Sequence, residues 1–446
     1  MNRSELEALS KDQLIDLVLR LIERIEALEA QLGHPAKTAK NSSVPPSRER
    51  KANQPSKPNR MGPPTGHRGT FRALSASPDR VIEVRAEACP HCSHRLSDAD
   101  QERLRVYDHV ELPPIRAVTT RLHLHRGVCP CCRKHFVAPA PEGMAPGSPF
   151  GPDLVALVLY LHVVHAISFK RMEEMLAGVF GLTISQGAIA NMLAHAQAPM
   201  RVAADDIAAQ VRASRVVASD ETSARVKGRN WWQWVLQSST AVYHVITDSR
   251  GAGVPADFLQ GAIPAVWVAD RYGAQNHHGK QRQVCLAHLL RDTQYVIDQG
   301  DEGFAPGFKK LLLRAIDIGR RRDELKDRTL QQYFHALYRE LNRMLDRPPT
   351  SAAGGKFVAA VNRCYHDLFV FITQRDVPAT NNVSERALRP SVIFRKVTGG
   401  FRSEGGASLY AAVVSVIATA KLAGKTALQA IADVLNPNKN VVSLQA

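Results

Sequence analysis

Two aspartates and a glutamate stand in sequence contexts that could bring them into one metal site. Asp220 follows the β-like run 215–219, Asp270 follows the run 264–269, and Glu385 lies in a helix-forming stretch. Carboxylates at the ends of two neighbouring strands, with a third from a helix laid across the sheet, can hold two Mg²⁺ ions about 3.5–4 Å apart. Such a pair stabilises the attacking and leaving oxygens of an in-line phosphoryl displacement, and Mg²⁺ prefers oxygen ligands. The chemistry that these residues suggest is the cutting and joining of DNA.

Each acid also has an ordinary structural explanation. The chain has 42 acidic residues, so many triplets arise by chance. An isolated Asp after a strand is usually a turn residue or a helix cap. The sequence around the three acids is what favours a shared site.

The overall composition predicts a polyanionic partner and no membrane. The chain has 446 residues, room for about three domains, and a formal net charge of +16, which suits nucleic acid. The longest apolar stretch, 154–167, is shorter than the roughly 18–20 residues that span a bilayer, and the N-terminus has no signal architecture. We therefore expect a cytoplasmic protein that is nucleoid-associated when bound to DNA.

The cysteines predict a zinc site. An odd count of seven, with two CxxC pairs, favours metal binding in a reducing compartment over disulfides. Two such pairs separated by β-like runs at 80–84 and 118–125 predict a tetrahedral Cys₄ zinc ribbon over residues 78–138. The expected ligands are Cys89, Cys92, Cys129 and Cys132. Cys131 could replace Cys132, and His91, His94 and His135 are spare candidates.

The first 34 residues predict a dimerisation helix. Ser10 and Gln13 form a capping box, and Gly33 with Pro35 ends the helix. A narrow heptad seam asks for a partner helix, so we expect a coiled-coil homodimer or higher oligomer. The seam is formed by Leu14, Val18, Leu21, Ile25, Leu28 and Leu32. An amphipathic helix packed on the protein's own body is the alternative.

Residues 35–77 predict a basic flexible arm. From position 35 to 72 the chain has nine Lys or Arg and one acid, Glu49, among Pro, Ser, Asn and Gly. Such a stretch buries too little apolar surface to order itself. It could be a plain linker or could also lie along DNA phosphates.

Residues 150–205 predict a helical region like a helix-turn-helix. A helix at 153–165 is followed by a second at 168–180, which Gly181 ends, and a third starts at Ser185. The third helix would present Ser185, Gln186 and Asn191 to a DNA groove. A helical bundle beside the catalytic core explains the pattern equally well.

Residues 212–425 predict a ribonuclease-H-like α/β core. Three antiparallel strands, a short helix at 254–259 and a strand bearing Asp270 open that fold, and they make Asp220 and Asp270 neighbours. In one strand Trp232, Trp234 and Leu236 share a face, as in a half-buried strand.

A long interval separates Asp270 from Glu385. It is strongly helical at 308–325, 330–345 and 356–373, so we expect an all-helical insertion at about 280–375 and, after the core, a C-terminal tail at 426–446. Its basic residues fit a DNA-facing surface or a solvated helix face equally well. They are Lys309, Lys310, Arg314 and the run 320–322.

Together these features resemble the transposases of the bacterial insertion-sequence-66 family, whose members have a leucine-zipper start, a zinc ribbon and a helical insertion. The resemblance covers almost the whole chain. The segments that carry it are KNSSVPPS at 40–47, CPHC at 89–92, LTISQGAIANML at 182–193, DET at 220–222, CLAHLLRD at 285–292 and NNVSERALRP at 381–390.

The resemblance implies a DDE enzyme with Asp220, Asp270 and Glu385 as its triad and Mg²⁺ or Mn²⁺ as its cofactor. It would bind the terminal inverted repeats of an insertion sequence and target DNA, cleave and transfer strands, and could work with element-encoded accessory proteins. Arg271 stands where the family commonly has a small residue, and could pair with phosphate or with Asp270. Candidate DNA-binding residues near the third acid are Arg386, Arg389, Arg395, Lys396 and Arg402.

Cys285 and His288 resemble a C-x-x-H element found after the second catalytic aspartate in several transposase families with insertions. Spaced i and i+3, they share a helix face. Cys285 would be a small buried residue. His288 is either a structural anchor or a proton carrier beside the active site, a task that suits histidine because its ordinary pKa lies near neutrality. We favour the role beside the active site because the motif recurs.

Two other functions remain open from the residues alone. A zinc-containing DNA-binding regulator would use the N-terminal modules but would not need three such acids. A ribonuclease-H-like structure-specific nuclease would share the metal site but rarely needs a dimerising helix and two DNA-reading modules. Inverted repeats flanking the coding region would favour transposition.

Overall fold

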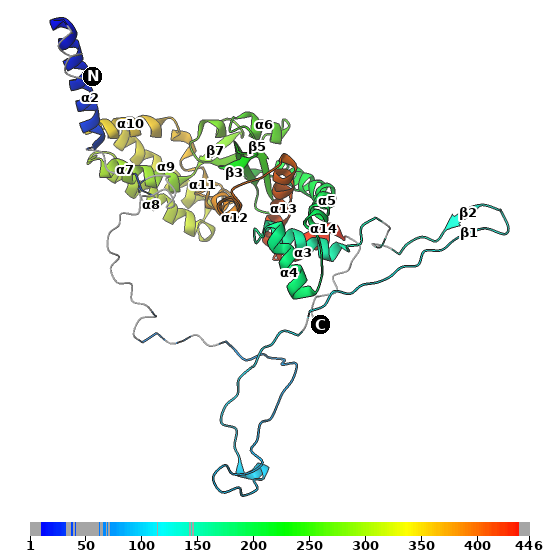
Figure 1. The fold of residues 1–446 in the computed structure, drawn as a ribbon. Coiled ribbons are helices and arrows are strands. Elements are labelled where there is room, and N and C mark those ends of the chain that lie inside the picture. The colour runs from blue at the N-terminus through cyan, green and yellow to red at the C-terminus, as the bar shows by residue number, and fades with distance from the viewer. Residues whose placement is uncertain are drawn as a thin grey trace.

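The computed structural model describes residues 10–32, 37–38, 41, 62, 66–67, 69, 72–113, 115–141, 144 and 147–436. A five-stranded mixed sheet lies at its centre, in the order β5-β4-β3-β6-β7 (Figure 1). The strands are β3 (Val216–Val226), β4 (Arg229–Gln237), β5 (Val242–Thr247), β6 (Val266–Ala269) and β7 (Gln281–Val284). The first three are antiparallel, and β6 and β7 run parallel to β3. With helix α6 (Gly253–Leu259) between β5 and β6, this arrangement is consistent with the predicted ribonuclease-H-like core.

The first face of the sheet, which carries Trp234 and Trp267, shares one hydrophobic core with residues of α6, with Phe394 and with five larger helices. They are α3 (Pro152–Val163), α4 (Phe169–Phe180), α5 (Gln186–Arg212), α13 (Glu404–Leu422) and α14 (Ala427–Leu435). Gly181 ends α4 with φ 66°, a conformation that costs glycine little. The helices predicted at 150–205 therefore belong to the same core as the sheet. Residues 427–435, predicted as part of a tail, form α14, whose Ile431 is fully buried.

Helix α13, with 19 residues, is longer than the apolar stretch 154–167. By length and composition it is the one helix in the described part of the chain that could span a membrane, and half of that window is buried within the protein. It packs against α5 and β5, as the core helix of a globular domain does.

The predicted helical insertion forms a second core beside the other face of the sheet. Its helices are α7 (Leu286–Asp298), α8 (Ala305–Arg321), α9 (Asp327–Leu345), α10 (Ala352–Asn362) and α11 (Val370–Thr373), with short 3₁₀ turns η4 (Arg322–Glu324) and η5 (Tyr365–Asp367). The single helix predicted at 356–373 is wrong. The chain breaks after α10 and turns at η5, which lets Cys364, Leu368 and Phe369 all enter the core.

Helix α12 (Asn382–Thr398) covers the second face of β3 and β4. The strand β4 was expected to be half-buried, but it is buried on both faces from Gln233 to Gln237. Trp234 and Leu236 enter the first core, whereas Val235 packs with Leu388 of α12. The expectation failed because α12 lies far along the chain.

The N-terminal elements extend away from this body (Figure 1). Helix α2 (Lys11–Leu32) forms as predicted, and its capping box is present, with N···O distances of 2.9 and 3.2 Å between Ser10 and Gln13. Val18 and Leu21 of the seam are exposed, while the side chains of Ile25, Leu28 and Leu32 lie outside the described residues.

The predicted ribbon region contains less sheet than expected. Segments 80–84 and 118–125 are extended but pair with no strand among the described residues, so the β-like composition there was misleading. A short hairpin does form, from β1 (Arg126–Val128) and β2 (His135–Val137). In the predicted arm, buried Asn41 contacts the body, donating a 2.9 Å hydrogen bond from Nδ2 to Asp298 of α7.

Candidate active site

Strands β3 and β6 place Asp220 and Asp270 beside each other. Their parallel register pairs Ala218 with Val268, and each aspartate lies two residues further along its chain. Residues two apart on a strand share a face, so both carboxylates lie on the second face of the sheet. The Asp270 carboxylate also accepts a 2.8 Å hydrogen bond from the N–H of Tyr272, which fixes its orientation. The predicted neighbourhood of the two aspartates is confirmed.

Helix α12 brings Glu385 to the same face. Asp220 lies opposite Val235 of β4, and Val235 packs with Leu388 of α12. Glu385 is three residues before Leu388, so it shares that side of the helix. It is half-buried, in the first turn of α12.

Asn381, just before α12, ties this helix to the sheet. Its Nδ2 donates a 2.7 Å hydrogen bond to the carbonyl of Ser219, the residue before Asp220. Its Oδ1 accepts from Ser384 Oγ at 2.7 Å, and its backbone N–H donates to Cys285 Sγ at 3.0 Å. Because Asn381 and its partners are buried, these bonds fix the start of α12 beside the strand that carries Asp220.

Helix α7 follows β7 directly and supplies His288. The N–H of Cys285 donates a 2.8 Å bond to the carbonyl of Ala269, which anchors α7 beside Asp270. One turn on, His288 Nε2 donates to Glu385 Oε1 at 2.8 Å, and Arg291 Nη2 lies 3.7 Å from the same oxygen. The structure thus gives Cys285 the predicted buried role and places His288 in direct contact with the third acid.

The electrostatics of the site reflect crowded carboxylates. Burial, together with the charges of Glu221 and Asp270, raises the pKa of Asp220 to about 8. The hydrogen bond from His288 lowers the pKa of Glu385. Burial alone would lower the pKa of His288, but its bond to Glu385 and the charges of Asp270 and Glu385 raise it above its usual value. The side chains of His288 and Arg291 lie beside Glu385, while the charges of Asp220 and Asp270 repel each other.

Glu221, the neighbouring acid, belongs to the opposite face of β3. Its carboxylate accepts hydrogen bonds of 3.1 and 2.8 Å from Arg250 and one of 2.8 Å from Gln275. The Arg250 guanidinium lies between the rings of Trp232 and Tyr272, 4.5 and 4.0 Å from their centroids. Glu221 is thus held in a closed structural cluster and is a poor substitute for Asp220.

Two other charged residues near the site are accounted for. Arg271 forms an ion pair with Asp292 of α7. The ion pair between Arg271 and Asp270, one of the two possibilities expected, is therefore not the one that the structure contains. Asp248, another acid close in sequence to the core strands, is exposed beyond the end of β5 and accepts a hydrogen bond from Thr247.

The donor set suits a divalent cation. Asp220, Asp270 and Glu385 offer only carboxylate oxygens, the ligands that Mg²⁺ and Mn²⁺ prefer. The raised pKa of Asp220 marks an excess of negative charge that a cation would remove. Within the described ranges, no three His, Cys, Asp or Glu side chains already converge as metal ligands do, and Glu385 is turned toward His288 and Arg291.

Comparison with known proteins identifies the family. The sequence model described as "Transposase IS66 family" matches residues 147–409, which contain the sheet, the helical insertion and α12. The chain belongs to the IS66 transposase family. This transposase is therefore a DDE enzyme, a polynucleotidyl transferase that acts on DNA with a divalent metal. Family membership favours transposition over the regulator and nuclease alternatives.

Two similar curated proteins come from Sinorhizobium fredii (strain NBRC 101917 / NGR234). "Uncharacterized protein y4jD" is 24% identical over 394 residues, which cover 80% of the transposase and 76% of that relative. "Uncharacterized protein y4qI" is 24% identical over 281 residues, covering 55% of the transposase and 51% of that relative. The first similarity extends well beyond the matched family domain.

The residues predicted to bind DNA fall into two groups. On and after α12, Arg386, Arg389, Lys396 and Arg402 are exposed, whereas Arg395 is partly buried and donates a 2.8 Å bond to Ser223 of β3. At the start of α5, the Ser185 hydroxyl caps the helix, Gln186 bonds Glu173, and Asn191 is exposed. α4 and α5 form as expected, and DNA reading by them stays a prediction.

The two cysteine pairs of the transposase lie on matching turns. Ser93 N–H donates to Cys89 O and Arg133 N–H to Cys129 O, each at 2.9 Å, and both donor residues have φ near 60°. N–H groups two and three residues further on, those of His91 and Cys92, lower the pKa of Cys89, and those of Cys132 and Cys131 lower the pKa of Cys129. In this correspondence Cys132 matches Cys92, and Cys131 matches His91. The two turns stand apart, at the ends of separate loops.

Sequence reasoning missed two residues of the site. Asn381 and Arg291 lie inside the motifs at 381–390 and 285–292 that carried the family resemblance, yet neither was given a role. An Asn directly before a helix is a familiar cap signal. Here the side chain bonds the neighbouring strand as well as Ser384, which the local sequence could not indicate.

Proposed function

We propose that this transposase binds the terminal inverted repeats of its insertion sequence, and that it cuts and joins strands at Asp220, Asp270 and Glu385. The observation that carries the proposal is the pairing of the two aspartates on parallel strands beside the first turn of α12. The three carboxylates would hold Mg²⁺ or Mn²⁺. The bound metal ions would stabilise the attacking and leaving oxygens of the phosphoryl transfer.

Two side chains of the protein fix the position of the third carboxylate, that of Glu385. The N–H of His288 holds one oxygen of Glu385, and Arg291 adds positive charge beside it. Partners of this kind orient a ligand and tune its basicity. We infer that His288 is a positioning residue for Glu385, and that the geometry gives less support to a free proton carrier.

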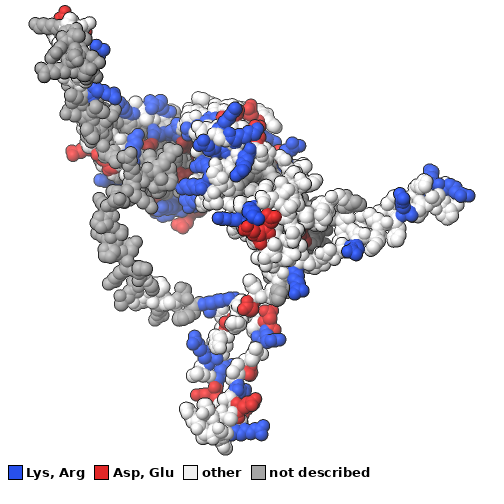
Figure 2. All heavy atoms as spheres, in the orientation of Figure 1, with Lys and Arg blue, Asp and Glu red and all other residues white. Residues whose placement is uncertain are grey.

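Exposed basic residues next to the site would hold the DNA backbone. The solvent side of α12 carries the exposed residues Arg386, Arg389 and Lys396. The opposite side of the helix packs Leu388, one turn after Glu385, against the sheet. Figure 2 shows Lys and Arg spread over the visible face of the body. Phosphate contacts of this kind supply most of the affinity for DNA without reading its sequence.

The zinc ribbon is part of the same proposal. Two matching turns with N–H groups directed at Cys89 and Cys129 favour thiolates, which are the form that binds zinc. Cys89, Cys92, Cys129 and Cys132 would complete one tetrahedral Zn²⁺ site and draw the two loops together into a DNA-binding module.

Self-association through α2 would bring two active sites to two element ends. Ile15, Val18, Leu21 and Ile22 are all 45–52% exposed, an apolar surface that a second helix would cover. A truncation that removes residues 1–34 should convert the protein from dimer or higher oligomer to monomer on light scattering. A truncated protein that stays oligomeric would place the interface elsewhere.

The decisive experiment replaces each acid by its amide and assays labelled element ends with Mg²⁺ or Mn²⁺. Asp220→Asn, Asp270→Asn and Glu385→Gln should each abolish strand cleavage and joining. Binding to element ends, measured without added Mg²⁺ or Mn²⁺, should be retained because it rests on Lys and Arg. Asp248→Asn, an exposed acid beyond β5, is the matched control and should remain active. Near-normal cleavage by any of the three amide variants would remove that residue from the site.

A further inference from the structure

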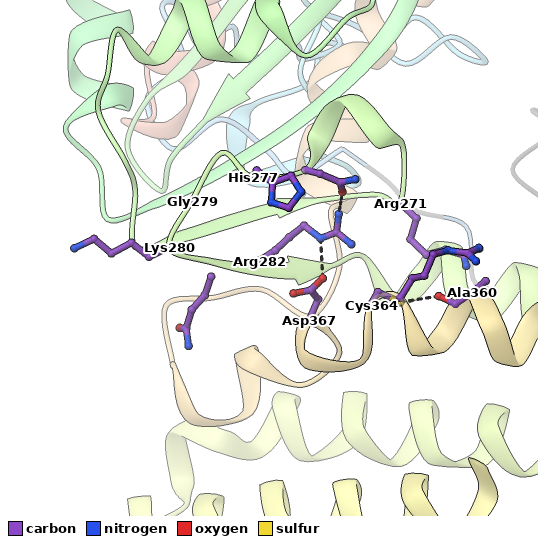
Figure 3. A pocket seen from close by; sticks show the side chains of 11 residues that line it. Arg271, His277, Gly279, Lys280, Arg282, Ala360, Cys364 and Asp367 are labelled. Atoms are coloured by element: carbon purple, nitrogen blue, oxygen red, sulfur yellow. Dashed lines mark hydrogen bonds and ion pairs between the residues drawn. The ribbon is translucent and has the colours of Figure 1, made fainter. Parts of the chain in front are cut away.

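A groove lies along the outer strand of the sheet, between β7 and the helical insertion (Figure 3). It encloses about 710 Å³ and is lined by the loop before β7, by β7 itself and by the end of α10 with η5. Arg271, directly after Asp270, also lines this β7 groove. The groove therefore runs from the edge of the sheet toward the active site.

Its lining is strongly cationic. Arg271, Lys280, Arg282 and Arg363 supply four positive charges, against the single carboxylate of Asp367. Arg282 takes that carboxylate, with a 3.0 Å bond from Nε to Oδ2, and Arg271 pairs with Asp292. Within the described part of the chain, no hydrogen bond or ion pair engages the side chains of Lys280 and Arg363.

The loop that carries Lys280 is held tightly. A Cβ on Gly279 would come within 2.9 Å of the backbone nitrogen of Trp267, so the loop can lie this close to β6 only with glycine there. His277, exposed on the groove wall, has φ 66°. Left-handed backbone is uncommon outside glycine and is often found where a ligand is held. The basic wall of the β7 groove is thus held in a strained backbone conformation.

The basic residues predicted to face DNA from the insertion are mostly used inside the protein. Arg314 pairs with Glu340 at 2.6 Å, Arg321 pairs with Asp317 at 2.9 Å, and Arg322 donates to two backbone carbonyls. Unpaired positive charges around a cavity repel each other, and a bound anion relieves that repulsion. The β7 groove is the better anion site.

The dimensions of the groove decide which form of DNA it can hold. Cavities of roughly 300–1,000 Å³ take ligands of drug size. The groove therefore accommodates a nucleotide or two of one strand, and not a duplex, whose major groove alone is about 12 Å wide.

We propose that the β7 groove binds the phosphates of a single DNA strand that leaves the active site past Arg271, with Lys280 and Arg363 as its main contacts. The proposal rests on the proposed function, because it names a strand of that same DNA substrate. The junction between the core and the insertion would then guide one strand after the duplex end has opened.

The test measures binding without added Mg²⁺ or Mn²⁺ and without chelator, by fluorescence anisotropy of the full-length protein, so it does not depend on catalysis and leaves the proposed zinc in place. The probes are an element-end duplex with a blunt end and the same duplex with a short single-stranded tail. The Lys280→Ala/Arg363→Ala variant is compared with Lys310→Ala/Arg339→Ala, which removes an exposed Lys and Arg of α8 and α9 outside the groove. All four side chains are exposed, so both variants should melt as the wild type does.

We expect the tail to tighten binding by the wild type and the control, and the groove variant to lose that gain while binding the blunt duplex normally. Single strands contribute about 0.7 to the salt slope per phosphate contact, so losing two contacts lowers the slope by about 1.4. Between about 50 and 200 mM salt this is about a seven-fold difference in the affinity change.

An equal gain from the tail in the groove variant, an equal loss in the control, or no gain in the wild type would overturn the proposal. The last result, together with metal-dependent cleavage that requires Asp220, would leave the proposed function intact. A tail effect that depends on Lys280 and Arg363 in a protein whose Asp220→Asn variant still cleaves would support the groove and refute the triad.

Discussion

Replacing Asn381 with alanine tests how the active site is held together. The variant deprives the carbonyl of Ser219 and the hydroxyl of Ser384 of buried partners that now lie 2.7 Å away. A buried polar group left unpaired costs about 1–3 kcal/mol. The unpaired Ser219 carbonyl and the lost bond of Ser384, whose hydroxyl still accepts from Gln237 Nε2 at 2.9 Å, should together cost roughly 2–4 kcal/mol of unfolding free energy.

The next residue provides a matched control. Asn382 is the same amino acid one position later, exposed at the start of α12, so Asn382→Ala should stay within about 0.5 kcal/mol of the wild type. In a domain of this size 1 kcal/mol moves the melting temperature by about 2–4 °C, so Asn381→Ala should melt roughly 5–10 °C lower. Strand cleavage per folded molecule should also fall, because Glu385 sits one turn from the lost anchor.

Both readouts are needed. Equal melting temperatures for the two alanine variants would refute the idea that Asn381 fastens α12 to β3. A lower melting temperature with unchanged cleavage per folded molecule would show that Asn381 stabilises the fold but does not position Glu385. Thermal scans, cleavage of labelled element ends and an active-site titration of folded protein separate these results.

Three further predictions follow from particular contacts. His288→Gln should lower strand joining about 10- to 100-fold, which is the usual cost of losing the partner that orients a metal ligand. The melting temperature and DNA binding should stay unchanged. A lower melting temperature with full activity per folded molecule would show that His288 is structural. Purified protein should contain about one zinc per chain, which elemental analysis should find lost in Cys132→Ser and kept in Cys131→Ser; the reverse pattern would exchange the two as ligands. Burial lowers the pKa of His244 to about 3, against about 6.5 when unfolded, so protonation favours the unfolded state. The stability that neutral His244 contributes is complete above about pH 6.5 and falls by about 1.4 kcal/mol per pH unit between about pH 6.5 and pH 3. Urea unfolding of His244→Gln should therefore show a smaller loss of stability over this pH range than the wild type. The same pH dependence in both proteins would contradict the prediction.

The sheet and its two aspartates could be predicted because their signals are local. Runs of β-branched and aromatic residues mark β4 and β6, and the order of strands and helix limits the topology. Once that order is known, Asp220 and Asp270 must be neighbours, and the register of β3 with β6 confirms it.

The errors arose where distant segments decide the outcome. β4 looks half-buried until α12 covers its second face, and the helix expected across 356–373 breaks because Cys364 and Phe369 both turn into the insertion core. The expected strands of the ribbon failed for the opposite reason. Those β-branched runs lie in loops where, in the part of the chain that the structure describes, no neighbouring strand supplies hydrogen bonds.

Within the site, contacts across long separations could not be derived from the residues. His288 and Glu385 are 97 positions apart, and Asn381 is 96 positions from Cys285. The family motifs marked these segments as important but gave no geometry. Glu221 and Asp220 differ only by strand alternation, which requires knowing which face α12 covers.

The dependence of the site on α12 also has a consequence during synthesis. Chains emerge from the ribosome N-terminus first, at about 5–20 residues per second, and domains fold as units. Asp220 is made early, but Glu385 and the Asn381 anchor follow only after the whole helical insertion, a delay of roughly 10–30 s at that rate. During this interval α2 and the cysteine turns are already outside, whereas the carboxylate set is incomplete. A nascent transposase could therefore find DNA, or a second nascent chain, before it is able to cut.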